Sequence, residues 1–490
     1  MTIVLAADLG GTSVKAALVT EAGHMVALAT IPAPTPGVSG LILPPEWWSC
    51  LRAAATSLRR DNEQAFLATE AVAITGVTRT PVVLDELGNS LTGAISARDT
   101  RAQDIAARTA IGPEFCAEAA HYDAFHPAAR LKWISQQNPK ALVFAAAVVD
   151  PKDFIGAQLT GRIASDAIAM ARLVAAASSL DGPSLLSRLD LPENLVPDLL
   201  PPGSVIERVR TSLGEPFNAL AGRPVVMASH DTWSGVVGMG ALVAGRAYNV
   251  SGTTETFGVL ARKPVKATGL MDVPWGDELH QIGGPGQNGA DVLTWLGAVI
   301  GAATPEEIAP RVAGAISVAR HARPLLFLPY LSGERVPFWD ADLRAAFLGL
   351  SREHGPADFV WATLEGVAFL NRIVLGRAET AAGLTVDEVR LGGGAARIAA
   401  WAQIKADVLE RPVVTVIAEE PGVLGAAIAA FVGLGTFKSF EEAQERLVRT
   451  AKRFEPRRER RDFYRALSLL FAQAHDAVRP LSHQLSKLAP

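Results

Sequence analysis

Apolar positions at the start of the chain follow the patterns of strands. Residues 3–7 form a continuous apolar run, as in a buried strand. A Gly-rich turn follows, and apolar residues then alternate with a period of two from Val14 to Leu18. A third strand is predicted near 25–30, so the chain opens as a β-meander. A helix at 47–60 and a buried strand at 70–77 continue the domain.

The opening pattern returns half a chain later. Residues 248–260 predict a strand, a Gly-Thr-Thr turn and a second strand, like those around residue 8. Residues 389–395 then predict a strand and a glycine turn that open a helix of about fifteen residues. A charged segment at 452–461 precedes an amphipathic terminal helix. Two similar α/β halves predict a duplicated fold with a cleft between them; the alternative is a chance resemblance of two hairpins.

Composition narrows the class of protein. The 490 residues carry 46 Lys+Arg and 50 Asp+Glu, a net charge of −4, so nucleic acid is not an expected partner. With 49% hydrophobic and 20% charged residues, the chain is not expected to be disordered. Gly 43 and Pro 31 are scattered and indicate many turns. We expect two domains, 1–243 and 244–490.

Cysteine and apolar content predict a cytoplasmic protein. Cys50 and Cys116 form no CxxC pair, so neither a disulfide framework nor a zinc site is expected. The longest apolar candidate, 423–434, falls short of the roughly 18 residues of a membrane helix. The first residues lack the positive region of a signal peptide. A membrane is therefore not an expected partner.

The first turn has the chemistry of an anion site. Small residues let a backbone approach an anion, successive N–H groups can hold phosphate oxygens, and hydroxyls add donors. A carboxylate at the strand end can hold Mg²⁺. The turn is neither a Walker A loop nor a Rossmann fingerprint, because GxxxxGK[ST] and GxGxxG are absent; a plain hairpin is the alternative. Its candidate residues are Asp8, Gly10, Gly11, Thr12, Ser13 and Lys15.

Two further turns are candidates for binding the same ligand. The turn Gly252, Thr253 and Thr254 could hold the far side of a polyphosphate, although Gly-Thr pairs are frequent. Glycines 392–394, before a predicted helix, suit an anion or leave room for an adenine ring. Tight packing of strand on helix is the alternative for these glycines.

A carboxylate before an apolar helix is the candidate general base. Asp231 follows a predicted strand and could accept the proton of an attacking hydroxyl. It could instead cap the helix, and His230 alone is more often structural. Polar residues after other strands could bind a polyol: Thr78, Arg79, Asp99 and Arg101.

In combination these motifs resemble the FGGY family of carbohydrate kinases over nearly the whole chain. The two phosphate turns and His230–Asp231 match the family's pattern. Asp99 and Arg101 also match the family's pattern, although Ala97 replaces the usual Trp. The family's T-D-x-S-x-A signature is reduced here to residues 165–169. The most specific matches are residues 327–340, 347–369, 391–403 and 421–427.

The resemblance implies an α/β fold of two actin-like (ribonuclease H-like) domains with ATP and sugar in a central cleft. It implies transfer of the γ-phosphoryl group of Mg-ATP to a sugar hydroxyl, with Asp231 as base and Asp8 at Mg²⁺. Residues implied at ATP are Gly10, Gly11, Thr12, Ser13, Lys15, Gly252, Thr253, Thr254, Gly393, Gly394, Ala395 and Arg397. Residues implied at the sugar are Thr78, Arg79, Asp99, His230, Asp231 and Trp233.

Departures from the family pattern concern the substrate. Xylulose kinases usually carry Met-His where this chain has Thr78 and Arg79. An Arg facing the ligand would favour an acidic or more oxidised sugar. D-xylulose is the first candidate, followed by other pentuloses, tetritols, pentitols and acidic sugars. A nucleotide-binding regulator without turnover is the second function class. A nicotinamide-dependent enzyme is disfavoured, because the GxGxxG motif is missing. A homodimer is a possible assembly.

Overall fold

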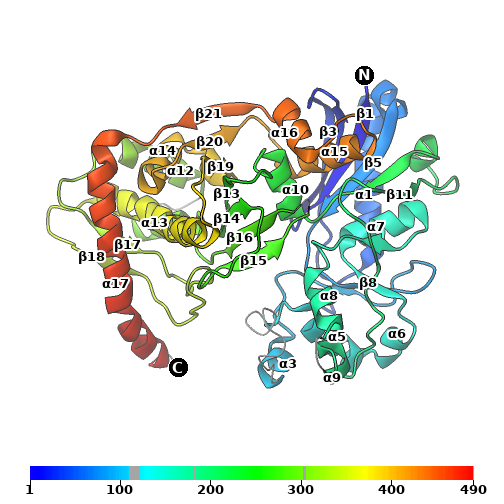
Figure 1. The fold of residues 1–490 in the computed structure, drawn as a ribbon, viewed down its shortest axis with the longest axis horizontal. Helices are drawn as coiled ribbons and strands as arrows, with labels where there is room; N and C mark the ends of the chain where they lie inside the picture. The colour runs from blue at the N-terminus through cyan, green and yellow to red at the C-terminus, as the bar shows by residue number, and fades with distance from the viewer. Residues whose placement is uncertain (110–121, 180–181, 277, 302–304, 489–490) are drawn as a thin grey trace. The chain divides into compact units, whose positions relative to one another are not determined.

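The computed structural model describes residues 1–109, 122–179, 182–276, 278–301 and 305–488, without the side chains of 305–309. Cys116 lies outside these residues. The chain forms two compact units, each drawn from two stretches of sequence (Figure 1). The first comprises Met1–Gly238 and Ala418–Val448; the second comprises Met239–Ile417 and Arg449–Pro490.

The first unit is built on a six-stranded mixed sheet. Its order is β11 (Val205–Arg208), β12 (Pro224–Met227), β5 (Thr69–Gly76), β1 (Ile3–Leu9), β2 (Ser13–Thr20) and β3 (Met25–Pro32). The predicted meander is β1, β2 and β3, which pair antiparallel. Strands β5 and β12 continue the sheet in parallel with β1, and β11 is antiparallel to β12.

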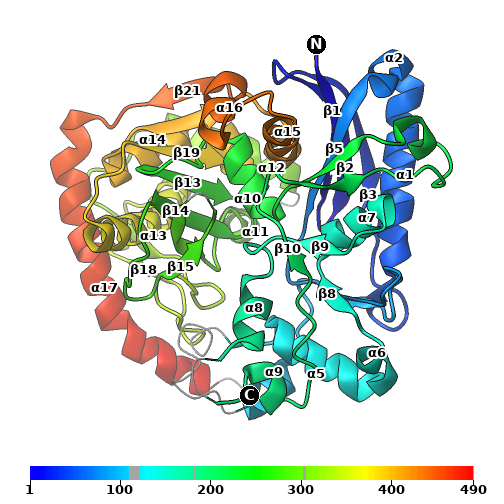
Figure 2. The same cartoon turned by 45° about the vertical axis from the view of Figure 1, so that its right-hand side comes forward.

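Helices cover both faces of this sheet. Alternate β1 residues such as Leu5 and Ala7 share a core cluster with Leu51 of α1 (Pro44–Asp61). The other β1 face meets α15 (Pro421–Gly433), whose middle is almost entirely buried and which also packs on α10 (Asp231–Gly238). Figure 2 shows α1 and α15 on opposite sides of the strands. The carboxyl end of β1 is thereby enclosed.

The second unit repeats the plan. Its sheet runs β15 (Met271–Pro274), β16 (His280–Pro285), β14 (Glu255–Ala261), β13 (Arg246–Ser251), β19 (Glu388–Gly392), β20 (Val413–Val416) and β21 (Thr450–Phe454). Strands β13, β14 and β16 form the antiparallel meander, and β19 and β20 extend the sheet in parallel with β13. An antiparallel strand, β21, follows β20 as β11 follows β12. The predicted echo is thus part of a repeat of six strands, and β15 is an additional strand of the second sheet.

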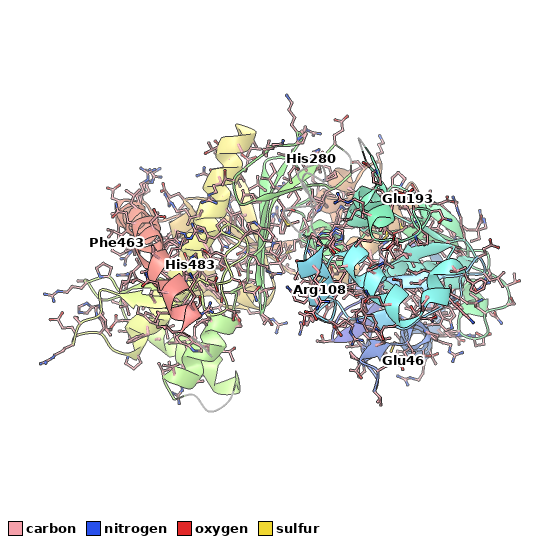
Figure 3. The ribbon with its side chains drawn as sticks, turned by 90° about the horizontal axis from the view of Figure 1, so that it is seen from below. Glu46, Arg108, Glu193, His280, Phe463 and His483 are labelled. Atoms are coloured by element: carbon pink, nitrogen blue, oxygen red, sulfur yellow. The ribbon has the colours of Figure 1, made fainter. Side chains whose placement is uncertain are left out.

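Three helices pack in the second unit. They are α13 (Pro356–Ala382), α14 (Ala399–Leu409) and α17 (Arg461–Lys487), the predicted terminal helix. Figure 3 labels Phe463 near the start of α17 and His483 near its end. The end of α17 is fixed by Asp340, whose carboxylate lies 2.8 Å from His483 Nε2 and accepts a 2.9 Å hydrogen bond from Arg479 Nε.

The remaining helices and strands connect these layers. In the first unit they are β4 (Leu41–Ile42), α2 (Glu63–Leu67), β6 (Val82–Leu84), β7 (Ala94–Ile95), α3 (Gln103–Arg108), α5 (Pro127–Gln137), α6 (Pro139–Val143), β8 (Ala147–Val149), α7 (Pro151–Thr160), β9 (Ala164–Ser165), α8 (Ala171–Ala177), α9 (Leu185–Arg188), β10 (Asp198–Leu199), η2 (Phe217–Leu220) and α16 (Phe440–Leu447). In the second unit they are α11 (Asp291–Val299), α12 (Pro305–Ser317), β17 (Leu326–Leu328), β18 (Ala346–Leu348), η3 (Gly394–Arg397) and η4 (Arg458–Arg460).

Two expectations differ from the structure. The predicted division, 1–243 and 244–490, places 418–448 in the second half, whereas this segment packs with the first unit because α15 buries its apolar surface on β1 and α10. The stretch 423–434 is also not the strongest apolar candidate. Helix α13 is long and apolar enough to cross a membrane, yet 72% of its apolar window is buried, as in a core helix.

Candidate active site

Asp8 is a half-buried carboxylate at the end of β1. It pairs in register with Lys15 of β2 and with Thr75 of β5. Its Oδ1 is buried without a hydrogen-bond partner among the described residues. A Cβ on Gly422 would lie within 3.0 Å of Oδ2, so α15 can approach this carboxylate only through a glycine. Burial and then the nearby charge of Asp231 raise the pKa of Asp8 to about 7.

Lys15 is held by a residue that the sequence motifs did not include. Its Nζ donates a 2.6 Å hydrogen bond to Oε2 of Glu420, the residue before α15, and both side chains are half-buried. The charge of Glu420 also raises the pKa of Asp8, whereas that of Lys15 lowers it. Because 405 residues separate the pair, no local pattern predicts it. The only sequence signal is an acidic residue beside the Pro421 motif.

The first turn is a tight connection between β1 and β2. The Gly10 N–H donates to the Ser13 carbonyl at 3.0 Å. A Cβ on Gly10 would lie 2.8 Å from that carbonyl, so the turn requires a residue without a side chain there. Gly11 and Thr12 are exposed at the tip. The turn thus presents backbone and hydroxyl groups beside Asp8 and Lys15.

Asp231 is the first residue of α10. Its Oδ1 accepts hydrogen bonds from the Thr232 N–H at 2.6 Å and from the Thr232 hydroxyl at 3.2 Å, and the side chain is 37% exposed. His230 Nδ1 lies 3.7 Å from this oxygen and accepts the Trp233 N–H at 3.3 Å. Asp231 therefore keeps an accessible carboxylate near Asp8, while His230 supports the helix start.

Trp233 is wrongly placed by the sequence prediction. Only 1% of it is exposed, and its ring packs edge-on against Phe440 of α16, with centroids 5.2 Å apart. A side chain buried in the core contacts no sugar. Its position two residues after Asp231 turns it to the interior of the helix, which sequence proximity does not show.

The predicted sugar residues share buried partners. Arg130, fully buried, donates to the carbonyls of Arg79 and Asp99. The Thr78 hydroxyl donates to Asp150 Oδ2 at 2.8 Å. Burial, and then the charge of a neighbouring carboxylate, raise the pKa of Asp150 to about 7. Thr78, Arg79 and Asp99 are therefore brought together, by two residues that sequence reasoning missed.

Two of these residues have constrained geometry. Arg79 has a left-handed backbone, with φ of 59°, uncommon for a residue with a long side chain. Asp99 forms an ion pair with Arg101, in which the Arg101 NH2 atom lies 2.7 Å from Asp99 Oδ2. Burial alone would raise the pKa of Asp99, but the hydrogen bonds and charge of Arg101 outweigh it and hold the pKa below its usual range. Asp99 is thus already paired.

The second unit brings its two predicted turns together. The Gly252 N–H donates to the Thr254 carbonyl at 3.1 Å, and Thr253 and Thr254 are exposed. Gly393 has φ of 77°, and a Cβ there would lie within 3.0 Å of the Ser251 carbonyl. The glycines lead into the short 3₁₀-helix η3 and not directly into an α-helix. In η3, Ala395 is buried and Arg397 is exposed. Helix α14 begins only at Ala399.

Asp8 is the predicted metal ligand. Among the described residues no group of three His, Cys, Asp or Glu side chains could hold a metal ion. Mg²⁺ is commonly bound by one or two carboxylates, water and substrate phosphates, so such a group is not required. The unpartnered Oδ1 of Asp8 is an oxygen donor of the type this ion prefers.

Sequence models of one family cover both halves of the chain. The "FGGY family of carbohydrate kinases, N-terminal domain" matches residues 3–238, and the C-terminal domain matches 247–434. The chain belongs to the FGGY family of carbohydrate kinases. This membership confirms the predicted family and the predicted sugar kinase, a phosphotransferase that takes its phosphoryl group from ATP.

Similar FGGY kinases differ in their sugars. The gluconokinase of Bacillus licheniformis is 26% identical over 99% of this chain and 97% of its own length. The xylulose kinase of Escherichia coli K12 is 27% identical over 94% and 97%. The crystal structure of a "xyloylose kinase" from Brucella ovis superposes with a TM-score of 0.87 at 25% identity, covering 98% and 100%. The predicted two-domain actin-like α/β fold is confirmed, while the substrate is not fixed by these likenesses.

Proposed function

We propose that this FGGY kinase phosphorylates a hydroxyl of a ketopentose, with D-xylulose as first candidate. Asp231 accepts the proton of the attacking hydroxyl. The observation that carries this role is its position: an accessible carboxylate at the start of α10, whose charge acts on Asp8. Phosphoryl transfer depends mostly on positioning and electrostatics, so one well-placed carboxylate suffices.

The remaining roles follow from the groups each turn presents. Thr12, Ser13 and Lys15 would bind phosphate oxygens, and Asp8 would hold Mg²⁺, which neutralises phosphate charge when bound. Thr253 and Thr254 would contact the polyphosphate from the second unit, with Gly393, Gly394, Ala395 and Arg397 at the adenosine. Lys15 can donate to phosphate while it keeps its hydrogen bond to Glu420, because its ammonium group has three N–H donors. A cytoplasmic location and a homodimer stay predictions.

The test of the base is one isosteric substitution. Asp231→Asn keeps the shape of the side chain but accepts no proton, so kcat should fall by about 10²-fold or more. ADP release with the preferred sugar measures it. The matched control is Asp190→Asn, because Asp190 is on the surface of the same unit and its left-handed backbone also suits Asn. Turnover within a few-fold of wild type in Asp231→Asn would remove Asp231 from this role.

An acidic sugar is the second candidate substrate. Gluconokinases are among the similar proteins, and Arg79 lies beside Thr78 on a loop that Arg130 fixes. A guanidinium pairs well with a carboxylate. A panel of D-xylulose, other pentuloses, tetritols, pentitols and gluconate, with ADP release as readout, separates the candidates. Arg79→Met should lower kcat/KM for gluconate about tenfold or more relative to D-xylulose. Arg98→Met should not, because Arg98 is an exposed residue of the turn after β7.

Equal losses on all sugars in Arg79→Met would show that Arg79 shapes the loop and does not select a carboxylate. If the wild-type enzyme released no ADP above background with gluconate, gluconate would be excluded as a substrate.

A further inference from the structure

A small cavity of about 10 Å³ lies inside the second unit, next to the Gly252–Thr254 turn. Glu255, the first residue of β14 after this turn, lines it together with Asn288 and Glu334. Its remaining walls are apolar or glycine: Phe257, Gly284, Gly286, Val336, Leu370 and Val374, with Asn371 beside them. A space of this size fits one water molecule.

The hydrogen bonding of Glu255 is uneven. Its Oε1 accepts from the Asn249 amide at 2.8 Å and from Lys405 Nζ at 2.6 Å. Lys405 is itself buried and also donates to Asn371 Oδ1 at 2.7 Å. Oε2 of Glu255 is buried and has no partner among the described residues. A buried carboxylate oxygen requires a donor.

Asn288 presents a second acceptor. Its amide nitrogen donates to the Gly333 carbonyl at 2.7 Å and to Glu334 Oε2 at 3.0 Å, which fixes the orientation of the amide. Its Oδ1 is buried without a partner in the described part of the chain. Two side chains that line one cavity thus each carry one unsatisfied acceptor and no spare donor.

We propose that this cavity binds one structural water molecule, which donates one hydrogen to Glu255 Oε2 and the other to Asn288 Oδ1. A water supplies two donors for two acceptors. A monovalent cation fits less well, because the Lys405 ammonium already neutralises Glu255 and both oxygens of Glu334, the other carboxylate at the cavity, already accept hydrogen bonds. The water molecule should stay bound, because without it the two buried acceptors remain unpaired.

The water would brace the second phosphate turn. The residues after Asn288 bind that turn directly: the Gly289 N–H donates to the Thr253 carbonyl at 3.2 Å, and the Ala290 N–H donates to the Gly252 carbonyl at 2.7 Å. Joining Asn288 to Glu255 therefore ties both sides of the turn to one point. This consequence, unlike the water site itself, rests on the proposed contact of the turn with ATP.

A high-resolution crystal structure of the wild-type enzyme tests the site directly. The expected result is a solvent peak within hydrogen-bond distance of both oxygens, unchanged in crystals soaked in RbCl. No peak, or a direct bond between the two side chains, would overturn the proposal. An anomalous rubidium peak would overturn it in favour of a cation.

Gly286→Ala tests what the water does. A methyl group there enters the cavity wall, 3.1 Å from Glu334 Oε1 and 3.2 Å from the Glu255 carbonyl oxygen. We expect loss of the solvent peak and a KM for ATP raised about fivefold or more, with the sugar KM unchanged. Gly376→Ala in α13, where a Cβ meets no atom, is the control. Loss of the peak with an unchanged KM for ATP would overturn the bracing role. The Asp231→Asn experiment tests the proposed function separately.

Discussion

Asp8 is a half-buried carboxylate whose Oδ1 atom has no contact with water. Burial raises its pKa to about 7 from 3.8, so the folded state binds a proton that the unfolded chain releases at lower pH. The protonated Asp8 stabilises the fold at low pH, and this contribution is lost as the pH rises through about 7. Ionisation of Asp8 thus costs free energy in the free protein. A cation bound at Asp8 would favour the ionised carboxylate.

Asp8→Asn should therefore stabilise the protein at high pH. At pH 8 we expect the free energy of unfolding to rise by about 1 to 4 kcal/mol over wild type, with a much smaller difference at pH 4. Urea unfolding of both proteins across pH 4 to 8 measures it, with Asp190→Asn as the exposed control. A difference that does not change with pH would mean that Asp8 titrates normally. Activity should be lost in the same variant.

Single residues of the site were predictable where their signal is local. Asp8, Lys15 and the glycines of the first turn stand within eight positions and form a recognisable motif. Glu420, Gly422 and Arg130 act on that motif or on the sugar loop from distant positions, so only the folded chain relates them. Trp233 shows the opposite error, because proximity to Asp231 in sequence is not proximity to the ligand.

Helices α10 and α15 approach each other through glycines. A Cβ on Gly238 would lie within 3.0 Å of the Pro421 carbonyl, and one on Gly425 would lie within 3.0 Å of the Ser234 carbonyl. Helix backbones this close leave no room for a side chain between them. The contact also sets the distance between Asp231, at the start of α10, and Gly422 beside Asp8.

Gly425→Ala should separate the two helices. We expect a loss of about 1 to 3 kcal/mol in stability from overpacking, and a fall in kcat because Asp231 and Asp8 shift apart. Gly235→Ala is the matched control: it lies in α10, and a Cβ there meets nothing within 4 Å, so stability should be equal or slightly higher. Thermal unfolding and ADP release measure both. Equal behaviour of the two variants would contradict the close approach.

Elements were predictable where periodicity is strong. The predicted strands at 3–7 and 70–77 and the helix at 47–60 correspond to β1, β5 and α1, with ends displaced by a few residues. The glycines at 392–394 do not lead directly into the predicted helix, since Gly393, with φ of 77°, precedes the short 3₁₀-helix η3 and α14 begins only after it. The apolar run of α13 was not predicted, because Thr363, Glu365 and Asn371 interrupt it in the sequence, and the fold buries these polar residues together with the apolar ones.

At the scale of the whole molecule, the echo of two hairpins proved to be the start of two equivalent sheets. In each, an antiparallel meander is followed by two parallel strands and one more antiparallel strand. The hairpin turns, at Gly10 and Gly252, occupy the same place in both. A sequence pattern could suggest this repeat, but it could not show that α15 leaves the second stretch of sequence to complete the first unit.

The discontinuous first unit predicts how fragments behave. Residues 1–238 alone lack α15, whose residues Val423, Ile428 and Phe431 are fully buried. Their removal exposes the apolar face of β1 and β5, so this fragment should unfold readily or aggregate. A fusion of 1–238 to 418–448 through a flexible linker restores the contact and should unfold cooperatively at a higher temperature. Circular dichroism melts compare the two, with a fusion carrying Ile428→Asp as control. Equal melting of the fragment and both fusions would show that α15 adds nothing to the first unit.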